Sequence, residues 1–378
     1  MLGFTNASHA PDRHRNGTPP PLMRRPLYQA RGVQRGTAIR VPTCRSAVRR
    51  VPPQWGMKTP LLEEPVGVMS AGATTLTLGH SPDGDDMAMW WPLTGMRDPS
   101  GHPVNDDAGR PRVDTAPFAF ETLADDVHEL NKRAFRQGDL DATAISAATY
   151  PFISDRYIVT ACGGSFGEGY GPRVVVRAAS PITNEDGLRD EFPLVAIPGA
   201  DTTAFMALSL LLGHRPRFVE ARFDRIPEIV AKGEADAGLL IHEAQLTFES
   251  VGLREVANLG EWWTREKGIP LPLGLNAVRR DLDLRFGSGA VDRVAGMLSQ
   301  SVRFARAHRE DCRRLLLLHA ETRPEWRDDA LVDRYLTMYV SPMSENMGDA
   351  GREALRVLFT EAAAAGLCPE IGEVEVVG

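Results

Sequence analysis

A single histidine, His242, stands where an apolar segment ends and a polar one begins. The residues before it, Leu239–Ile241, favour a β-strand, and Glu243 follows as the expected start of a helix. An imidazole titrates near neutral pH, so at this position it can accept a proton during a reaction. The alternative is a histidine that only packs in the core or caps a helix. His242 is our candidate for the general base.

A second polar segment follows an apolar strand about 160 residues upstream, in LTLGHSPDGDD. We expect Asp86 of this segment to hydrogen-bond a substrate or to orient the base, and the alternative is a loop that caps the next helix. A calcium loop of the EF-hand type is excluded, because the twelfth position from Asp83 is Thr94. Position 246 is leucine, so the zinc motif H-E-x-x-H is also missing and we expect no metal.

Hydroxyl groups lie at two further predicted element ends. Ser146 ends a strand, and Thr202 and Thr203 begin a helix. Hydroxyls and the free N–H groups of a helix N-terminus suit a carboxylate or hydroxylated ligand, although helix capping is the simpler role of both threonines. Ligands of open α/β sheets bind beyond the carboxyl ends of strands, so we expect these residues to share one cleft with His242.

A repeated αβ unit is expected to position these residues. Arg136–Ser146 (RQGDLDATAIS) and Ala231–Ile241 (AKGEADAGLLI) share the order helix, glycine, acidic turn and buried strand, at a spacing of 95 residues. Two such units predict two α/β lobes that face each other across a cleft. We also expect a capping box at Thr122 to open a helix over 123–137, and C-terminal helices over 288–307, 309–319, 327–339 and 349–365.

The charge of the chain is unevenly distributed. Residues 1–58 contain 11 Lys and Arg and one acidic residue, whereas the rest contains 32 basic and 49 acidic residues. The acidic body argues against a nucleic-acid partner. No apolar run approaches the ~18 residues of a membrane span, so no membrane partner is expected either.

The basic N-terminal segment and the cysteines bear on location. The Pro- and Arg-rich residues 1–65 predict a disordered tail, with Met57 as an alternative start of the native chain. This tail lacks the apolar core of a signal peptide. The cysteines, Cys44, Cys162, Cys312 and Cys368, have no metal or redox spacing, which favours a reducing cytoplasm.

Several segments together resemble the 1,4-dihydroxy-6-naphthoate synthase family. They are GHSPDGDDMAMWW, TAISAATYPFISDRY, GYGPRVVVR, AIPGADTTAF, GEADAGLLIHEAQLTFESVGL and LGEWWTREKGIPLPLG. They span roughly Leu76–Asp281 in order, and the combination of IHE with EWW and GIPLPLG is the most specific. The resemblance implies an α/β fold of the type-2 periplasmic-binding-protein class, with two lobes around a central ligand cleft and C-terminal helices. We expect lobe 1 over 66–172 and 279–378, and lobe 2 over 173–278.

The resemblance also implies an activity. Members are lyases of the futalosine route to menaquinone, which convert cyclic dehypoxanthinyl futalosine to 1,4-dihydroxy-6-naphthoate without a metal or organic cofactor. The family's catalytic base falls on His242. Its substrate contacts fall on Ala144, Ile145 and Ser146 and on Thr202 and Thr203.

Two alternatives stay open. One is a non-catalytic solute-binding protein of the same fold, which would need an export signal or a lipid-anchored cysteine. The other is an enzyme similar to chorismate dehydratase, against which the IHE and EWW segments argue. In each case the expected partner is a small molecule, and the sequence leaves the oligomeric state open.

Overall fold

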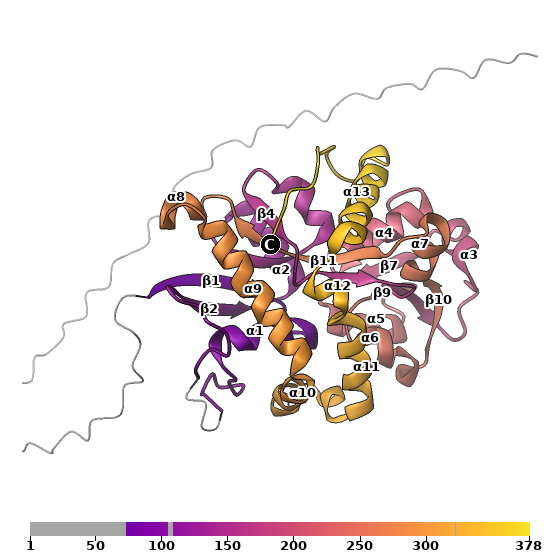
Figure 1. Cartoon of the computed structure of the whole chain (residues 1–378). Coiled ribbons are helices and arrows are strands. Elements are labelled where there is room, and N and C mark those ends of the chain that lie inside the picture. Colours follow the sequence, from indigo (N-terminus) through magenta and orange to yellow (C-terminus); the bar gives the residue numbers. More distant parts are fainter. Residues whose placement is uncertain (1–72, 105–108, 322) are drawn as a thin grey trace, which may run out of the picture. The chain divides into compact units, whose positions relative to one another are not determined.

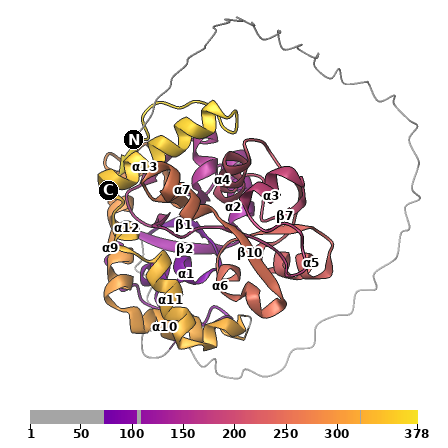
Figure 2. The same cartoon turned by 90° about the vertical axis from the view of Figure 1, so that its right-hand side faces the viewer.

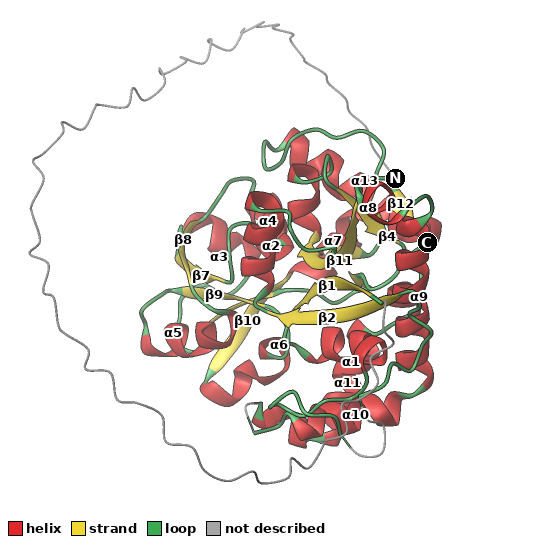
Figure 3. Ribbon diagram, turned by 90° about the vertical axis from the view of Figure 1, so that its left-hand side faces the viewer, coloured by secondary structure: helices red, strands yellow, loops and turns green. Residues whose placement is uncertain are grey.

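The computed structural model describes residues 73–104, 109–321 and 323–378. The predicted basic tail, 1–65, lies outside these residues. The described chain forms two β-sheets with helices packed outside them (Figures 1 and 3). None of the helices in these ranges combines the length and the apolar character needed to cross a membrane.

The first sheet has the strand order β12-β4-β11-β3-β1-β2, and β5 pairs with β11. β1 runs parallel to β2 and β3, while β11 runs antiparallel to β3, β4 and β5. The carboxyl ends of β1 and β3 therefore lie at the same edge of this sheet. The strands are β1 (Thr74–His80), β2 (Phe118–Ala124), β3 (Ala142–Ser146), β4 (Tyr157–Thr160), β5 (Ser165–Gly167), β11 (Leu271–Arg279) and β12 (Val376–Val377).

The second sheet has the order β10-β6-β9-β7-β8. β7 is parallel to β8 and β9, and β6 is antiparallel to β9 and β10. Its strands are β6 (Arg173–Arg177), β7 (Leu194–Ile197), β8 (Arg217–Glu220), β9 (Ala237–Leu240) and β10 (Leu253–Asn258). The chain enters this sheet after β5 and returns to the first sheet at β11.

The strand β11 corrects one predicted lobe boundary. The sequence places 173–278 in the second lobe, but β11 (Leu271–Arg279) pairs with β3, β4 and β5 of the first sheet. Apolar patterning identifies a strand but not its partners, and those partners are more than 100 residues away along the chain. The return to the first sheet therefore begins at Leu271.

Helices from the C-terminal part of the chain pack against the first helix. α1 contacts α9, α10 and α11, and Figure 2 shows the C-terminal helices along one side of the described residues. The helices are α1 (Gly84–Thr94), α2 (Val127–Arg136), α3 (Glu185–Asp190), α4 (Thr203–Leu212), α5 (Ile226–Lys232), α6 (Ala244–Thr247), α7 (Leu259–Lys267), α8 (Leu282–Phe286), α9 (Ala290–Ala307), α10 (Arg309–Leu318), α11 (Asp329–Tyr339), α12 (Pro342–Glu345) and α13 (Gly348–Ala364).

The predicted capping box at Thr122 is wrong. Thr122 lies inside β2, where it pairs with Leu78 of β1, and α2 begins only at its N-cap Asp126. The Asp126 carboxylate accepts the backbone N–H of His128 at 2.9 Å. Pairing with β1 extends this segment as an edge strand, so its tertiary partner overrides the local capping pattern.

The repeated αβ unit is present in both sheets. Gly138 and Gly233 follow α2 and α5 with φ of 60° and 79°, a region that glycine adopts at little cost. Asp141 accepts the backbone N–H of Thr77 in the neighbouring strand β1 at 2.8 Å, and Asp236 does the same for Leu194 of β7 at 2.9 Å. In each unit the aspartate before the buried strand, β3 or β9, thus binds the backbone of the parallel neighbouring strand. The buried strand then runs toward the site.

Candidate active site

A cleft of about 80 Å³ collects the residues that follow several of these strands. Its lining includes His242, Ser146, Thr202 and Thr203, so the structure brings together four of the predicted site residues from distant segments. Their contacts with a substrate stay predictions. Other lining residues are Asp85, Val127, Ser165, Pro172, Ala204, Ile241, Gln245, Leu273, Gly274 and Tyr339.

Larger cavities in the described residues lie elsewhere, and two of them are near the site. One, of about 450 Å³, lies beside α2 and the start of α4. The other, of about 570 Å³, lies beside α1 and α10. Neither is lined by His242, so size alone does not identify the site. We place the site in the small cleft because buried titratable groups converge there.

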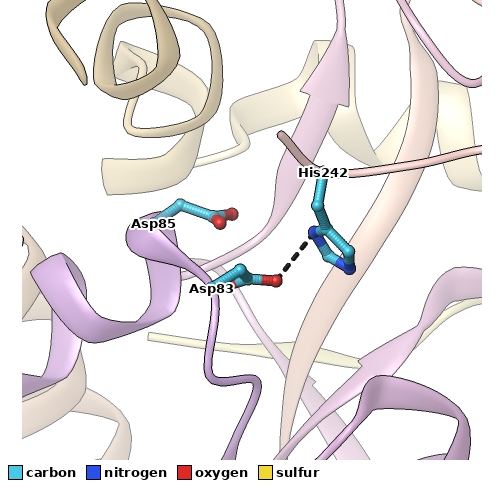
Figure 4. A group of neighbouring side chains, drawn as sticks. All are labelled: Asp83, Asp85 and His242. Atoms are coloured by element: carbon cyan, nitrogen blue, oxygen red, sulfur yellow. Dashed lines mark ion pairs between the residues drawn. The ribbon is translucent and has the colours of Figure 1, made fainter. Parts of the chain in front are cut away.

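His242 pairs with an aspartate of the other lobe. It follows β9 of the second sheet, and its Nδ1 lies 2.7 Å from Oδ2 of Asp83, the N-cap residue of α1 (Figure 4). The imidazole also packs edge-on against the ring of Phe223, with ring centroids 4.8 Å apart. A carboxylate on one ring nitrogen fixes the tautomer and the orientation of the ring.

The second ring nitrogen of His242 has no such partner. Nε2 is buried and makes no hydrogen bond to any of the described residues. A buried polar atom without a partner is unfavourable unless a ligand satisfies it. Since His242 lines the cleft, Nε2 is the atom available to exchange a proton with a bound molecule.

Pairing of Asp83 with His242 shifts the pKa of both side chains. Burial raises the pKa of the Asp83 carboxyl, but the charge and hydrogen bond of His242 outweigh burial and hold this pKa well below its usual value. Burial likewise lowers the pKa of His242, but the charge and hydrogen bond of Asp83 prevail and raise it to about 9. The pair therefore exists as imidazolium and carboxylate at neutral pH. The pKa of His242 thus lies above the near-neutral value of an ordinary imidazole.

Glu243 ties the histidine segment to the start of α1. Its Oε1 accepts the backbone N–H of Gly84 at 3.3 Å and the indole N–H of Trp326 at 3.2 Å. Its Oε2 lies 3.5 Å from the guanidinium of Arg323. A carboxylate at a helix N-terminus is favourable, and here the carboxylate and the helix belong to different lobes. Glu243 is also the N-cap residue of α6, as the sequence predicts.

Gln245 and Tyr339 are site residues that the sequence did not indicate. The Gln245 amide, oriented to satisfy both partners, accepts the Tyr339 hydroxyl at 2.7 Å and the backbone N–H of His242 at 3.2 Å. The one sequence signal for Gln245 is its nearness to His242, three positions earlier in the chain. Tyr339 lies about 100 residues farther along the chain, at the end of α11, and carries no local signal.

Asp86 does not occupy the predicted role beside the base. Its Oδ2 accepts the backbone N–H of Ser81 at 2.6 Å and its Oδ1 accepts the indole N–H of Trp90 at 3.3 Å. Asp86 is not among the residues that line the cleft, and Asp83 takes the contact with His242. Burial and the charge of Asp83 raise the pKa of Asp86 to about 7. Asp86 lies three positions after the N-cap Asp83, in the first turn of α1, and its carboxylate turns back toward Ser81, which follows β1.

The strand β3 contributes only one of its three predicted contacts to the cleft. Ser146 lines it, and the serine hydroxyl accepts the side-chain N–H of Asn131 at 3.0 Å. Ile145 points to the opposite face of the strand and packs in the larger hydrophobic core. Ala144 shares the face of Ser146 but packs against Leu130 and Leu140. Neither Ala144 nor Ile145 lines the cleft in this structure.

Thr202 and Thr203 lie at the start of α4 and their hydroxyls are engaged. Thr202 is the N-cap residue, accepting the N–H of Phe205 at 3.3 Å and donating to the carbonyl of Gly199. The Thr203 hydroxyl donates to the carbonyl of Leu273 at 2.7 Å. The backbone amides of the first helical residues have no acceptor within the helix, so they are the groups left for an anionic ligand.

A cation site was not expected, and one group of described residues comes near to forming one. Ligand atoms of Asp83, Asp85 and His242 all lie within 4.8 Å of one another. However, His242 Nδ1 and Asp83 Oδ2 are only 2.7 Å apart, which is a hydrogen-bond distance. Two ligands of a tetrahedral zinc ion, each ~2.0–2.1 Å from the metal, would stand about 3.3 Å apart. The geometry therefore fits an ion pair better than a metal site.

Comparisons with known proteins identify the family of this chain. A 1,4-dihydroxy-6-naphthoate synthase from Thermus thermophilus is 37% identical over 293 residues, which cover 77% of this chain and 95% of that enzyme. The enzyme of the same name from Streptomyces coelicolor is 34% identical over 274 residues, covering 71% and 91%. Residues 76–364 match the family described as menaquinone biosynthesis.

Solved structures show the same fold. A crystallised protein from Archaeoglobus fulgidus has a TM-score of 0.65 at 32% identity and covers 78% of this chain and 98% of its own. The alkanesulfonate-binding protein SsuA from Xanthomonas axonopodis has a TM-score of 0.55 at 13% identity, covering 81% and 98%, which indicates the fold alone. The predicted periplasmic-binding-protein-like fold with C-terminal helices is thus confirmed. Together with the matched segments, these relatives place the chain in the menaquinone-biosynthesis family of 1,4-dihydroxy-6-naphthoate synthases.

Proposed function

We propose that this enzyme is a carbon–carbon lyase that converts cyclic dehypoxanthinyl futalosine to 1,4-dihydroxy-6-naphthoate, with His242 as the general base. The family and its named relatives support the reaction. The observation that supports the role of the histidine is its buried Nε2: His242 lines the cleft, Asp83 holds its Nδ1, and no described residue hydrogen-bonds Nε2.

The chemistry requires one proton transfer and one bond cleavage. Nε2 of His242 removes the proton from a hydroxyl of the sugar-derived part, and the electron pair of that O–H bond forms a carbonyl. The adjacent C–C bond breaks, and its electron pair moves into the bicycle, which takes up a proton and becomes aromatic. The three-carbon fragment leaves. The Asp83 carboxylate stabilises the imidazolium that forms.

The other cleft residues suit the substrate carboxylate and the developing charge. The free amides at the start of α4 and the Ser146 hydroxyl are donors at one side of the cleft. At about 80 Å³ the cleft is far smaller than the ~300 Å³ or more of usual ligand pockets. The lobes must therefore separate to admit substrate and close again around it, which excludes water from the charged groups.

A solute-binding protein of the same fold is the second candidate. Its fold is compatible, since SsuA shares it, but binding alone does not need a buried imidazole with one ring nitrogen paired and the other free. The cytoplasmic location expected from the cysteines stays a prediction.

The test is to incubate the purified protein with cyclic dehypoxanthinyl futalosine and, separately, with chorismate. We expect dihydroxynaphthoate to appear only with the first, detected by absorbance and mass spectrometry. His242→Asn should abolish turnover and keep ligand affinity within about tenfold, because the ring is replaced by a group that cannot accept the proton. His214→Asn, at a half-buried histidine that stacks on Phe192 and does not line the cleft, is the matched control. Binding without turnover by the wild-type protein would support the solute-binding candidate instead.

A further inference from the structure

Asp85 is a buried carboxyl at the edge of the cleft. It lies in the first turn of α1, is 7% exposed, and lines the cleft beside His242. Its Oδ1 accepts the hydroxyl of Tyr335, from α11, at 2.6 Å. No lysine or arginine of the described residues forms an ion pair with it, and the Arg323 guanidinium in this region pairs with Glu243.

The carboxyl groups around His242 outnumber the cations. Asp83, Asp85, Asp86 and Glu243 are all buried, while His242 and Arg323 pair with Asp83 and Glu243. Asp86 is compensated by two N–H donors. Among the described residues the Asp85 carboxyl has one hydrogen-bond donor, Tyr335, and the charges that act on it are those of the carboxyl groups Asp83 and Asp86.

Two carboxyl groups that share one buried site do not both ionise. Asp83 is held ionised by His242, so the proton belongs to Asp85. Burial first, and then the charges of Asp83 and Asp86, raise the pKa of Asp85 well above its usual value. The carboxyl groups of Asp83 and Asp85 lie close together, with an oxygen of each within 4.8 Å of the other, so with Asp83 ionised a hydrogen bond between them must be donated by Asp85.

We propose that Asp85 is a positioning residue. It is a neutral carboxylic acid that accepts a hydrogen bond from Tyr335 and donates one to Asp83, and it thereby holds the Asp83 carboxylate in contact with His242. The resulting chain runs Tyr335, Asp85, Asp83, His242, and links α11 through α1 to the segment after β9. Its effect is to keep Nε2 directed at the cleft. This inference rests on the proposed function, because it assigns His242 as the base.

A neutral donor makes a specific prediction about substitutions. Asn has the shape of a protonated Asp and offers both an N–H donor and a carbonyl acceptor, whereas Ala offers neither. Asp85→Ala should lower kcat about 10- to 100-fold with KM within about threefold, since a partner that orients a reacting group is removed. The kcat of Asp85→Asn should be at least about tenfold higher than that of Asp85→Ala.

The charge of Asp85 is tested without turnover, by following the His242 ring in NMR titrations of the full chain. If Asp85 is neutral, Asp85→Asn removes no charge and the His242 midpoint moves by less than about 0.3 pH unit. Asp83→Asn, which removes a true charge, should lower the same midpoint by more than about one pH unit. The two substituted residues are two positions apart at the start of α1, and each variant replaces Asp with Asn, so the variants form a matched pair.

Three results would overturn the proposal. One is a His242 midpoint that falls by half a pH unit or more in Asp85→Asn, which would mean an ionised Asp85. Another is an Asn variant as impaired in kcat as the Ala variant. The third is stoichiometric binding of Zn²⁺ or Mg²⁺ that is lost in Asp85→Asn, which would make the group a cation site. If the wild-type protein failed to turn over the cyclic substrate, the proposed function would fail, while the titration would still report on Asp85.

Discussion

The backbone at His242 adopts φ 53°, a left-handed conformation that residues other than glycine seldom occupy. Such strain costs about 1–3 kcal/mol and persists where the surroundings over-determine the conformation. Here the surroundings are the Asp83 pair on the ring and the Gln245 amide on the backbone N–H. The strained turn directs the ring across the cleft toward the other lobe, instead of along the second sheet.

The pair with Asp83 sets the pH dependence of the reaction. A base acts through its unprotonated form, and the pKa of His242 is raised to about 9. We therefore expect kcat/KM to rise about tenfold per pH unit from pH 6 to 8 and to level off near pH 9. Initial rates across this range measure it. A profile that is flat between pH 7 and 9 would contradict the assignment of His242 as the base in this environment.

Removal of the Asp83 carboxylate should change both the maximal rate and the pH dependence of kcat/KM. Asp83→Asn leaves a hydrogen-bonding group but removes the charge that raises the pKa of His242, so the acidic limb of kcat/KM should move to lower pH. The maximal rate should fall about 100-fold, because the correct ring tautomer is no longer enforced. Asp98→Asn, in the loop after α1, is the control and should match the wild-type enzyme. An unshifted limb in Asp83→Asn would mean that the two groups are not paired in solution.

At the scale of elements, α2 and the start of α4 meet across the cleft. His128 of α2 lies 2.5 Å from Asp201 through Nδ1 and 3.8 Å from Glu220 through Nε2, and both acids follow or end strands of the second sheet. Gly199 allows this approach, because a Cβ there would lie 2.3 Å from the His128 ring. The hydrogen bond to Asp201 raises the pKa of His128 despite its partial burial. This contact joins the two lobes beside Thr202 and Thr203.

The lobe contact should strengthen closure when His128 is protonated. The folded-state pKa of His128 is raised, so its contribution is complete below about pH 6.5 and is lost as the pH rises through the raised value. His128→Ala should therefore raise the KM about three- to tenfold with little change in kcat, consistent with ~1 kcal/mol for a partly exposed pair. KM measured at pH 6 and pH 9 tests this, and the wild-type and variant values should converge at the higher pH.

A control on the same helix separates this contact from general damage to α2. Arg133 pairs with Asp139 within the first lobe, so Arg133→Ala should leave KM near the wild-type value. If both variants raise KM equally, the effect belongs to the helix and not to the contact between lobes.

At the scale of the whole described chain, the cleft is closed in this structure. Contacts that join the two lobes include Asp83 with His242, Gly84 with Glu243, and His128 with Asp201. Each involves a charged group, whose partner in the open form would be water. Such contacts stabilise closure modestly and allow the lobes to reopen after each turnover.

Ligand binding should therefore compact the protein. We expect small-angle scattering to show a radius of gyration about 1 Å smaller with saturating ligand than without it, as for other hinged two-lobe binders. His242→Asn provides a stable complex for this experiment, since it should bind the cyclic substrate without consuming it. Identical scattering curves with and without ligand would show that opening and closing do not accompany binding.

The sequence alone was sufficient for the local features. It identified the family, the repeated αβ unit, the helix start at Thr202, the position of Ser146 at the end of β3 and that of His242 shortly after β9. These features depend on hydrophobic periodicity, capping residues and short motifs, which lie within a few residues of one another.

Only the tertiary structure decided which of three neighbouring aspartates meets His242 and which sheet β11 joins. It also decided that Tyr339 lines the cleft and that Tyr335 contacts Asp85. It also decided that His242 is charged at neutral pH, since that follows from a carboxylate about 160 residues away in the chain. The physical reason is that burial and charge act through space. Capping and hydrophobic periodicity act between residues that are close in the chain. The sequence therefore predicts which residue ends a helix or strand, but not which side chains will contact that residue in the folded protein.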